Sequence, residues 1–439
     1  MDIAVNKNTR IALQLADFLL LVGVLALAFC YPPYLMSTQG YVAAVIWFIS
    51  IILVGGQNPR YLYPRYGILI SMGLSLFFTA VVGIIWAGSG WSWYMKGGLE
   101  AFAVLAVGGM LARYIIAQYL RQPTIQVVPF RTPDSHLPLL AELSRHPLIH
   151  VENSIDDPAA PLPEPRPGYT TRVIAGELRL RESTFNTLMP LLFTTDVVDL
   201  VNLYESIIGK AALIDSPDGW VVVKTLRQPS PMRRMTKRVF DVCFVLLTAP
   251  ITLPTILLAA LVVKLTSPGP VFFRQSRLGR HGKPFNLIKL RTMVVDAEAF
   301  GPRWSGADDP RITPIGRFLR TSGIDELPQF WNVLRGELSL IGPRPECPTI
   351  AERLAKNIPL YQARLLQDPG LTGWAQLNQG SDTDLTDVRS KLAYDLYYMQ
   401  NISLSLDCQI LLGTIQMILH LAKPAPRKVA AIVLSPSQV

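Results

Sequence analysis

Five long apolar stretches constrain the fold of this chain more than any other feature. Four lie at roughly 11–31, 39–56, 67–87 and 98–119, and the fifth runs from Val239 to Val263. Each is close to the ~20 residues that a helix needs to cross the hydrocarbon core of a bilayer. The first 120 residues hold nine charged side chains, although charged residues make up 17% of the whole chain. We therefore predict a membrane protein with a four-helix transmembrane block at 1–120.

The distribution of basic residues predicts the orientation of this block. Lys7 and Arg10 precede the first stretch, and Arg60 and Arg65 lie between the second and the third. Basic residues favour cytoplasmic loops, so both ends of the block are expected to face the cytoplasm. The four cysteines are not closely paired in sequence, so neither a disulfide framework nor a zinc site is expected.

Residues 121–228 have the composition of a small globular domain. Short β-like runs occur at 125–130, 169–174 and 220–224, and a helical pattern covers 194–208. We predict a cytosolic accessory α/β domain with a linker. The segment carries no glycine fingerprint, so no ligand is assigned to it.

The fifth apolar stretch has basic residues on both flanks and prolines inside. Residues 229–291 carry eleven basic side chains and one acid, Asp241. A spanning helix would place one of these basic flanks outside the cell. Pro250, near the middle, removes a backbone donor and bends a helix. We therefore predict a re-entrant membrane helix at about 238–264 that breaks at Pro250. A proline-kinked spanning helix is the alternative.

The rest of the chain predicts an α+β domain, so that the C-terminal unit covers 229–439. Strands are expected at 271–274 and 285–291, and a helix at 326–335 that stops at Gly336. Aromatic and aliphatic residues at helical spacing over 392–421 favour an interfacial amphipathic helix, although such patterns also occur in protein cores.

Two adjacent carboxylates, Asp325 and Glu326, are the strongest candidates for chemistry. A carboxylate at the start of the following helix would be held anionic by free N–H groups and the helix dipole. The same helix end would bind a phosphate, and Arg320 lies close in sequence. Neighbouring carboxylates also suit Mg²⁺. A solvated capping pair is the simpler interpretation of these two residues.

Arginines near glycine and proline turns strengthen the interpretation as a phosphate site. The planar guanidinium fork matches the oxygens of a diphosphate. Surface salt bridges would explain one or two of these arginines better than all of them. The candidates for substrate binding are Arg291, Arg311, Arg317, Arg320 and Arg344.

Six motifs in the same order resemble the bacterial sugar transferases, the monotopic phosphoglycosyl transferases. The matching region is about 230–421, and the preceding four membrane segments resemble the large form of the family. The motifs are Lys-Arg-Val-Phe-Asp (237–241), Ser-Pro-Gly-Pro-Val-Phe-Phe-Arg (267–274), Lys-Leu-Arg-Thr-Met (289–293), Asp-Glu-Leu-Pro-Gln-Phe-Trp-Asn (325–332), Ile-Gly-Pro-Arg-Pro (341–345) and Pro-Gly-Leu-Thr-Gly-Trp-Ala-Gln (369–376).

The resemblance implies a reaction in the cytoplasmic membrane of a bacterium. A UDP-sugar, with UDP-glucose or UDP-galactose favoured, would give its sugar-1-phosphate to undecaprenyl phosphate and leave UMP. This is the initiating step of exopolysaccharide, capsule or O-antigen assembly. Downstream glycosyltransferases and membrane lipids would be its partners, whereas nucleic acid would not, and a homo-oligomer stays open. The enzyme would be a multi-pass protein with its catalytic domain on the cytoplasmic face.

The resemblance also implies roles for individual residues. Asp325 would be the covalent nucleophile, Glu326 would share Mg²⁺ with it, and Arg320 would hold phosphate charge. Pro343 and Gln376, which belong to the fifth and sixth motifs, join the arginines as substrate-binding candidates. The chain departs from the family pattern at Gly323, before the dyad, and at Ala249, before the helix-breaking proline.

Two other function classes remain open from the sequence. An ordinary membrane glycosyltransferase would release UDP instead of UMP. A non-catalytic scaffold or regulator of polysaccharide export would use the arginines to bind lipid headgroups and would not need Asp325.

Overall fold

A computed structural model gives the fold of two separate units of the chain. It describes residues 124–130, 132–147, 149–155, 163–164, 167, 171–176, 196–216, 219–222, 230–297, 309–379 and 385–418. The predicted transmembrane block at 1–120 lies outside the described residues. One unit ends at Ala212 and also includes Leu404–Gln409, and the other contains the remaining residues from Leu213 onward.

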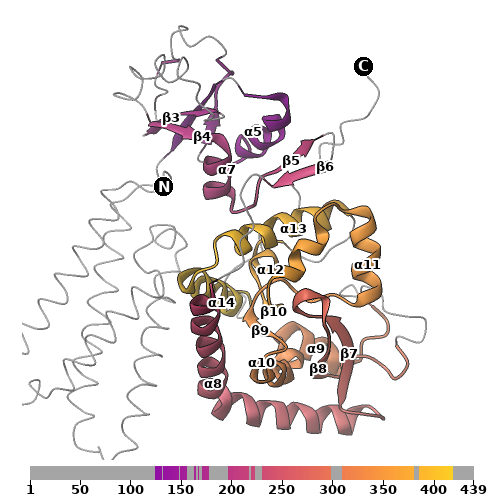
Figure 1. Cartoon of the computed structure of the whole chain (residues 1–439). Coiled ribbons are helices and arrows are strands. Elements are labelled where there is room, and N and C mark those ends of the chain that lie inside the picture. Colours follow the sequence, from indigo (N-terminus) through magenta and orange to yellow (C-terminus); the bar gives the residue numbers. More distant parts are fainter. Residues whose placement is uncertain are drawn as a thin grey trace, which may run out of the picture. The chain divides into compact units, whose positions relative to one another are not determined.

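The first unit contains a parallel sheet of four strands. Its order is β2-β1-β3-β4, with β1 central to the pairing. The sheet core consists of fully covered aliphatic side chains, such as Val127 and Val173. The predicted α/β character of the accessory segment is therefore confirmed for its described part (Figure 1). The elements are β1 (Ile125–Phe130), η2 (Asp134–His136), α5 (Leu137–Leu143), β2 (Ile149–Val151), β3 (Thr171–Gly176), β4 (Asp196–Asp199) and α7 (Leu200–Ile208).

The helix that we predicted over 194–208 is wrong at its start. Residues 196–199 form strand β4, and α7 begins only at Leu200. The two valines of Asp-Val-Val-Asp favour an extended strand. Asp199 then caps the helix, because its carboxylate accepts a hydrogen bond from Asn202 N at 3.0 Å.

The second unit is built around one long apolar helix, α8 (Pro231–Thr266). Among the described residues, α8 is long and apolar enough to cross a membrane. Figure 1 shows it as two limbs joined at a sharp bend, one limb running down from the level of α14 and the other running toward β7. Pro250 and Pro254 lie inside the helix and each removes a backbone hydrogen bond, which explains the bend.

The limb before the prolines is fastened to the domain by polar contacts. Asp241 is buried and accepts hydrogen bonds from Ser339 Oγ at 2.7 Å and Leu340 N at 3.3 Å. Arg238 donates to the carbonyl oxygens of Val333 and Leu334, where α10 ends. These contacts hold the beginning of α8 against the same domain that follows it in the sequence.

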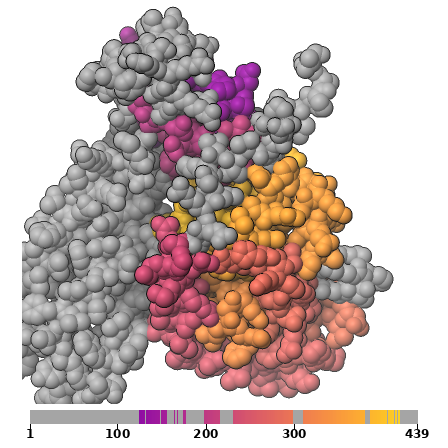
Figure 2. Space-filling view, in the orientation of Figure 1, coloured from indigo at the N-terminus to yellow at the C-terminus, as the bar shows by residue number. Residues whose placement is uncertain are grey.

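The limb after the prolines is fastened to that domain by apolar contacts. Ala259 and Val263 form a buried cluster with Leu290 and Leu319. Both limbs of α8 therefore return to one globular unit. Figure 2 shows α8 at the surface of this unit, and many of its apolar side chains are exposed. They are Met232, Met235, Val239, Leu246, Ile251, Leu253, Leu257, Leu258, Leu261 and Leu265.

The remaining elements form a mixed α+β domain, as the sequence predicts. The predicted strands are confirmed as an antiparallel hairpin, in which the first strand is longer than expected. The hairpin is β7 (Phe272–Leu278), η3 (Arg280–Gly282) and β8 (Pro284–Leu290); β5 (Leu213–Ser216) and β6 (Gly219–Val222) form a second one. The other elements are α9 (Pro314–Ser322), η4 (Ile324–Gln329), α10 (Phe330–Arg335), β9 (Ser339–Ile341), α11 (Pro348–Asn357), η5 (Tyr361–Leu366), β10 (Gly370–Thr372), α12 (Trp374–Asn378), α13 (Leu385–Gln400) and α14 (Leu404–Ile418), whose residues Leu404–Gln409 are grouped with the first unit.

The aromatic pattern near the C-terminus belongs to two helices instead of one. In α13 the apolar residues Leu392, Leu396 and Tyr398 are completely covered by protein. This helix is therefore a core element and not an interfacial one. Asn401 at the break donates its side-chain amide to the Tyr397 carbonyl oxygen, which accounts for a free carbonyl at the end of α13.

Candidate active site

The two candidate carboxylates lie at the start of a short 3-10 helix. Gly323 ends α9 with a positive φ of 69°, which favours glycine, and η4 begins at the next residue. The helix expected over 326–335 is present and ends at Gly336 as predicted, but its first part is the 3-10 helix η4 and the α-helix α10 covers only Phe330–Arg335. Neither Ser322 nor Asp325 caps η4, and the Ser322 hydroxyl donates to the Phe318 carbonyl oxygen at 2.9 Å. The charge of the dyad is therefore set by neighbouring side chains.

Arg344 grips the second carboxylate of the dyad with both of its terminal nitrogens. Its Nη2 lies 2.5 Å from Glu326 Oε1, and its Nη1 lies 3.4 Å from Glu326 Oε2. Burial alone would raise the pKa of Glu326, but the charge and hydrogen bonds of Arg344 hold it below its ordinary value. Glu326 in turn raises the pKa of Arg344. Glu326 is thus kept as an anion and fixed in orientation.

Asp325 is in a different electrostatic situation, although it is the adjacent residue. Only 5% of its surface is exposed. Burial and the charge of Glu326 raise the pKa of Asp325 to about 6, against the charges of Lys289, Arg320 and Arg344. A buried carboxylate that ionises near neutral pH is a common feature of catalytic sites.

Lys289 is a site residue that our selection of candidates missed. It lies near the end of β8, and its charge acts on both Glu326 and Asp325. Burial lowers its pKa, whereas Glu326 opposes this effect. Its sequence signal is a lysine among the mostly apolar residues Phe285–Leu290, in the motif that also contains the candidate Arg291.

Arg320 lies within electrostatic reach of Asp325. It stands in the last turn of α9, and its Nε donates to Thr292 Oγ1 at 3.0 Å. Thr292 follows β8, so this hydrogen bond orients Arg320 from the strand that also carries Lys289. Three cations, Lys289, Arg320 and Arg344, therefore surround the dyad.

Of the other three arginines, Arg291 and Arg311 have contacts of their own. Arg291 is buried, and its Nη2 donates to the Ser267 carbonyl oxygen, just beyond the end of α8, at 2.8 Å. Arg311 makes a two-pronged ion pair with Asp309, at 2.9 and 2.6 Å, and a hydrogen bond to the Ala297 carbonyl oxygen. Arg317 is exposed on α9. Their role in substrate binding stays a prediction.

Pro343 and Gln376 lie around the loop that carries Arg344. The Pro343 carbonyl oxygen accepts a hydrogen bond from Gly370 N at 2.9 Å, and Gln376 Nε2 donates to Leu371 O at 3.4 Å. Gly342 and Gly370 allow the close approach of these backbones, because a Cβ on Gly370 would stand 2.0 Å from Gly342 N. The two glycine motifs thus build the support for Arg344.

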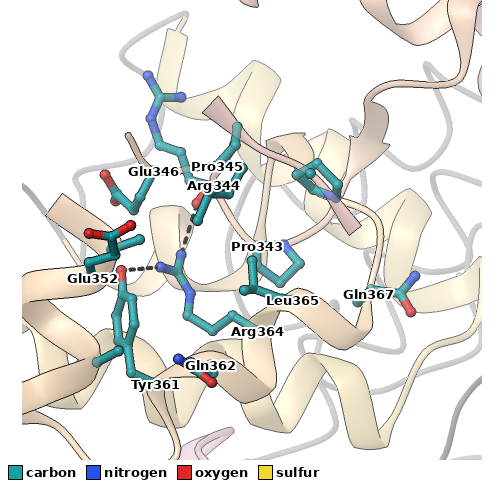
Figure 3. Close-up of a pocket in the computed structure, with 15 residues that line it drawn as sticks. Pro343, Arg344, Pro345, Glu346, Glu352, Tyr361, Gln362, Arg364, Leu365 and Gln367 are labelled. Carbon is teal, nitrogen blue, oxygen red and sulfur yellow. Dashed lines mark hydrogen bonds between the residues drawn. The ribbon is translucent and has the colours of Figure 1, made fainter. Parts of the chain in front are cut away.

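A pocket lies behind this loop (Figure 3). Its lining includes Pro343, Pro345, Tyr361 and Arg364, and neither carboxylate of the dyad belongs to it. Arg364 lines the pocket and donates hydrogen bonds to the Tyr361 hydroxyl and to the Arg344 carbonyl oxygen. The pocket therefore adjoins the backbone of Arg344, whereas the side chain of Arg344 contacts Glu326.

The dyad is the place where the sequence predicts Mg²⁺. Within the described ranges, no group of three or more His, Cys, Asp or Glu side chains could hold a metal ion by itself. Mg²⁺ is usually bound by one or two carboxylates and completes its shell with water and substrate phosphates. Asp325 and Glu326 supply two adjacent carboxylates, and both oxygens of Glu326 are already paired with Arg344. Binding of Mg²⁺ at the dyad stays a prediction.

Comparison with known proteins identifies the class to which this fold and site belong. The family model described as bacterial sugar transferase matches residues 232–421, which include α8, the dyad and the loop of Arg344. The chain belongs to this family, as the motifs predict.

Three relatives illustrate how much of the chain is shared. The UDP-glucose:undecaprenyl-phosphate glucose-1-phosphate transferase of Caulobacter vibrioides is 42% identical over 201 residues, which are 44% of this chain and 75% of that protein. The UDP-N-acetylgalactosamine-undecaprenyl-phosphate N-acetylgalactosaminephosphotransferase of Aeromonas hydrophila is 42% identical over 191 residues, 44% of this chain and 45% of its own. The exopolysaccharide production protein PSS of Rhizobium leguminosarum bv. phaseoli is 38% identical over 192 residues, 42% of this chain and 95% of its own. The match thus spans less than half of the Aeromonas relative and nearly all of the Rhizobium one.

Proposed function

We propose that this protein transfers sugar-1-phosphate from a UDP-sugar to undecaprenyl phosphate and releases UMP. The observation that carries the proposal is the buried Asp325, with a pKa raised to about 6, beside an anionic Glu326 and three cations. This arrangement provides both a nucleophile and a binding place for diphosphate charge. The names of the Caulobacter and Aeromonas relatives support the same class of donor and acceptor. UDP-glucose and UDP-galactose are the favoured donors, and UDP-N-acetylgalactosamine joins them in a test panel.

In the first step an oxygen of the Asp325 carboxylate attacks the β-phosphorus of the UDP-sugar. The bond between this phosphorus and the oxygen that bridges to the α-phosphate breaks, and UMP leaves with that electron pair. Lys289, Arg320 and Arg344 bind the non-bridging oxygens, where negative charge gathers in the transition state. Glu326 stays anionic against Arg344 and keeps this arginine directed at the site.

In the second step a phosphate oxygen of undecaprenyl phosphate attacks the same phosphorus. The bond to Asp325 breaks, so the free carboxylate returns and undecaprenyl-diphosphate-sugar leaves. Two steps on one nucleophile allow the soluble donor and the lipid acceptor to bind in turn. Mg²⁺ held by Asp325 and Glu326 would supply charge neutralisation for the diphosphate.

We further propose that α8 is a re-entrant helix that enters and leaves the cytoplasmic face of the bacterial inner membrane. Both of its limbs are fastened to one globular unit, by Asp241 before the prolines and by Val263 after them. A straight span would carry one of these contacts to the other side of the bilayer. The exposed apolar side of α8 would then lie in lipid, and the diphosphate site would face the cytosol.

Product analysis tests the reaction. Purified full-length protein with Mg²⁺ and undecaprenyl phosphate is given each labelled UDP-sugar of the panel, and the released nucleotide is separated. UMP together with a lipid-linked diphosphate sugar is the expected result. Release of UDP would identify an ordinary glycosyltransferase instead, and no turnover with any donor would favour the scaffold.

Cysteine labelling tests the membrane topology of α8. Thr236→Cys and Thr266→Cys, each in a background without other cysteines, place one thiol on either side of the prolines. An impermeant maleimide should label both in inverted vesicles and neither in intact spheroplasts. Labelling from opposite sides would contradict the re-entrant helix.

A further inference from the structure

The loop that carries Arg344 has two prolines and is therefore held through its carbonyl oxygens. Pro343 and Pro345 have no N–H to donate. The Pro343 carbonyl oxygen accepts from Gly370 N at 2.9 Å, and the Pro345 carbonyl oxygen accepts from Arg277 Nη1 at 2.9 Å. Between them, the Arg344 carbonyl oxygen accepts from Arg364 Nη2, also at 2.9 Å. The position of Arg344 thus depends directly on the guanidinium of Arg364.

Arg364 is itself fixed by two other elements. It is 7% exposed, its Nε donates to Asp395 Oδ2 at 2.8 Å, and its Nη1 donates to the Tyr361 hydroxyl at 2.6 Å. Asp395 lies on α13 and is 2% exposed, whereas Tyr361 and Arg364 both lie in η5. One planar group therefore joins α13, η5 and the loop of Arg344 (Figure 3).

We infer that Arg364 and Asp395 are positioning residues for the transfer reaction, because they set the place of Arg344 and through it the orientation of Glu326. This inference rests on the proposed function of the dyad. The sequence of contacts runs from Asp395 to Arg364, then to the Arg344 carbonyl oxygen, and then from the Arg344 guanidinium to Glu326. Neither residue touches the dyad, so both act through Arg344.

The geometry explains why this position takes arginine. A lysine could pair with Asp395, but its single ammonium cannot copy the planar fork that reaches three acceptors at once. A displacement of about 1 Å in a catalytic group lowers the rate by about 100-fold. A lost bond to the Arg344 carbonyl oxygen is therefore expected to lower kcat, while binding of the UDP-sugar through the other cations changes little.

The experiment compares three variants of the full-length protein in the UMP-release assay, with thermal unfolding measured on each. Arg364→Lys keeps the buried ion pair and loses the fork. Arg364→Met/Asp395→Leu replaces the pair with apolar groups, which buried sites often tolerate without loss of stability. Arg280→Gln/Asp368→Asn removes another ion pair of the same unit, and it is the matched control.

The expected result is a fall in kcat of about 100-fold in both Arg364 variants, with a KM for the UDP-sugar within about threefold of the wild type. Their unfolding midpoints should stay near that of the wild type, and the control should keep its kcat. Full kcat in a folded Arg364→Lys or in the folded double variant would overturn the inference, since the wild type is active in the same assay. Absence of UMP release from the wild type would overturn the proposed function and the inference with it.

Discussion

Two arginine–carboxylate contacts meet at the loop of Arg344, and they differ in how their charges are balanced. At the Arg364–Asp395 pair, one cation faces one anion, and hydrogen bonds to the Tyr361 hydroxyl and the Arg344 carbonyl oxygen use its other donors. Burial alone would disfavour the charge of Arg364, but Asp395 and Tyr361 raise its pKa. Burial also raises the pKa of Asp395, although Arg364 opposes this effect. The pair is therefore distinguished by its completed hydrogen bonds and not by an ordinary pKa.

The dyad is not satisfied in the same way. Glu326 is paired with Arg344, whereas the adjacent Asp325 is buried and carries a pKa raised to about 6. Lys289 is partly buried, its charge acts on these two carboxylates, and its pKa is lowered by burial. The hydrogen bonds of the supporting pair are therefore complete within the protein. The charges at the dyad are not balanced within the protein, and a diphosphate substrate would balance them.

The largest expected effect is on turnover after removal of the proposed nucleophile. Asp325→Asn keeps the shape of the side chain and lacks a nucleophilic carboxylate, so UMP release should fall by at least about 10⁴-fold. The control variant Asp368→Asn changes a carboxylate outside the dyad and should keep its activity in the same assay. An Asp325→Asn variant that retains a tenth of the wild-type rate would show that Asp325 is not the nucleophile and that the dyad only supports the site.

A large effect on stability is expected at the supporting pair. Asp395→Asn leaves the charge of Arg364 buried without its counter-ion, which typically costs about 3–5 kcal/mol. Thermal and denaturant unfolding of the purified protein should show this loss. If the variant were as stable as the wild type, the Arg364–Asp395 pair would not stabilise the fold, and the contrast with the dyad would fail.

Arg344 belongs to both contacts, and its substitution should separate geometry from charge. Arg344→Lys keeps a positive charge near Glu326 but loses the two-pronged hydrogen bond and the planar fork. We expect kcat to fall by about 100-fold, with a smaller change in unfolding midpoint than in Asp395→Asn. Steady-state kinetics and unfolding on the same preparation provide the measurement. A wild-type kcat in this variant would show that charge alone is sufficient.

The smallest expected effect is a gain in the free energy of unfolding from Asp325→Asn. Folding raises the pKa of Asp325 to about 6 from the ordinary value of 3.8, so the folded state holds the proton more tightly than the unfolded state. The stability that this proton gives is complete below the unfolded pKa and is lost as the pH rises through about 6. Asp325→Asn cannot titrate and should gain about 2 kcal/mol relative to the wild type between pH 4 and pH 7.5. Denaturant unfolding of both proteins in buffer without divalent cations measures this gain. If the difference in free energy of unfolding between variant and wild type stayed constant or fell as the pH rose, the raised pKa would be contradicted.

The residues of the candidate site could be selected from the sequence, whereas the local structure around the dyad could not be predicted in full. The motif spacing placed Asp325, Glu326 and Arg320 together, and Arg320 does act on Asp325. The helix expected after the dyad is present, but the sequence did not reveal that its first part is a 3-10 helix, which begins where Gly323 in a left-handed conformation ends α9. Such a conformation depends on packing as well as on residue type, so a pattern of caps does not reveal it.

The supporting contacts could not be predicted in the same way. Arg364 and Asp395 lie 31 positions apart, and neither belongs to a local pattern. Lys289 was visible as a charge in an apolar strand, but only the fold turns it toward the dyad. Arg311 looked like a phosphate ligand, whereas its guanidinium is engaged by Asp309, two residues away. Sequence patterns report which residues are present, and the pairing of charges requires the fold.

The most direct test of the account is isolation of the covalent intermediate. Full-length protein is incubated with Mg²⁺ and the accepted UDP-sugar without undecaprenyl phosphate, quenched in acid, digested and examined by tandem mass spectrometry. The account predicts a hexose-phosphate adduct on Asp325 that disappears when undecaprenyl phosphate is added and does not form in Asp325→Asn. An adduct on another residue, or UMP release and lipid product at wild-type rate from Asp325→Asn, would contradict it.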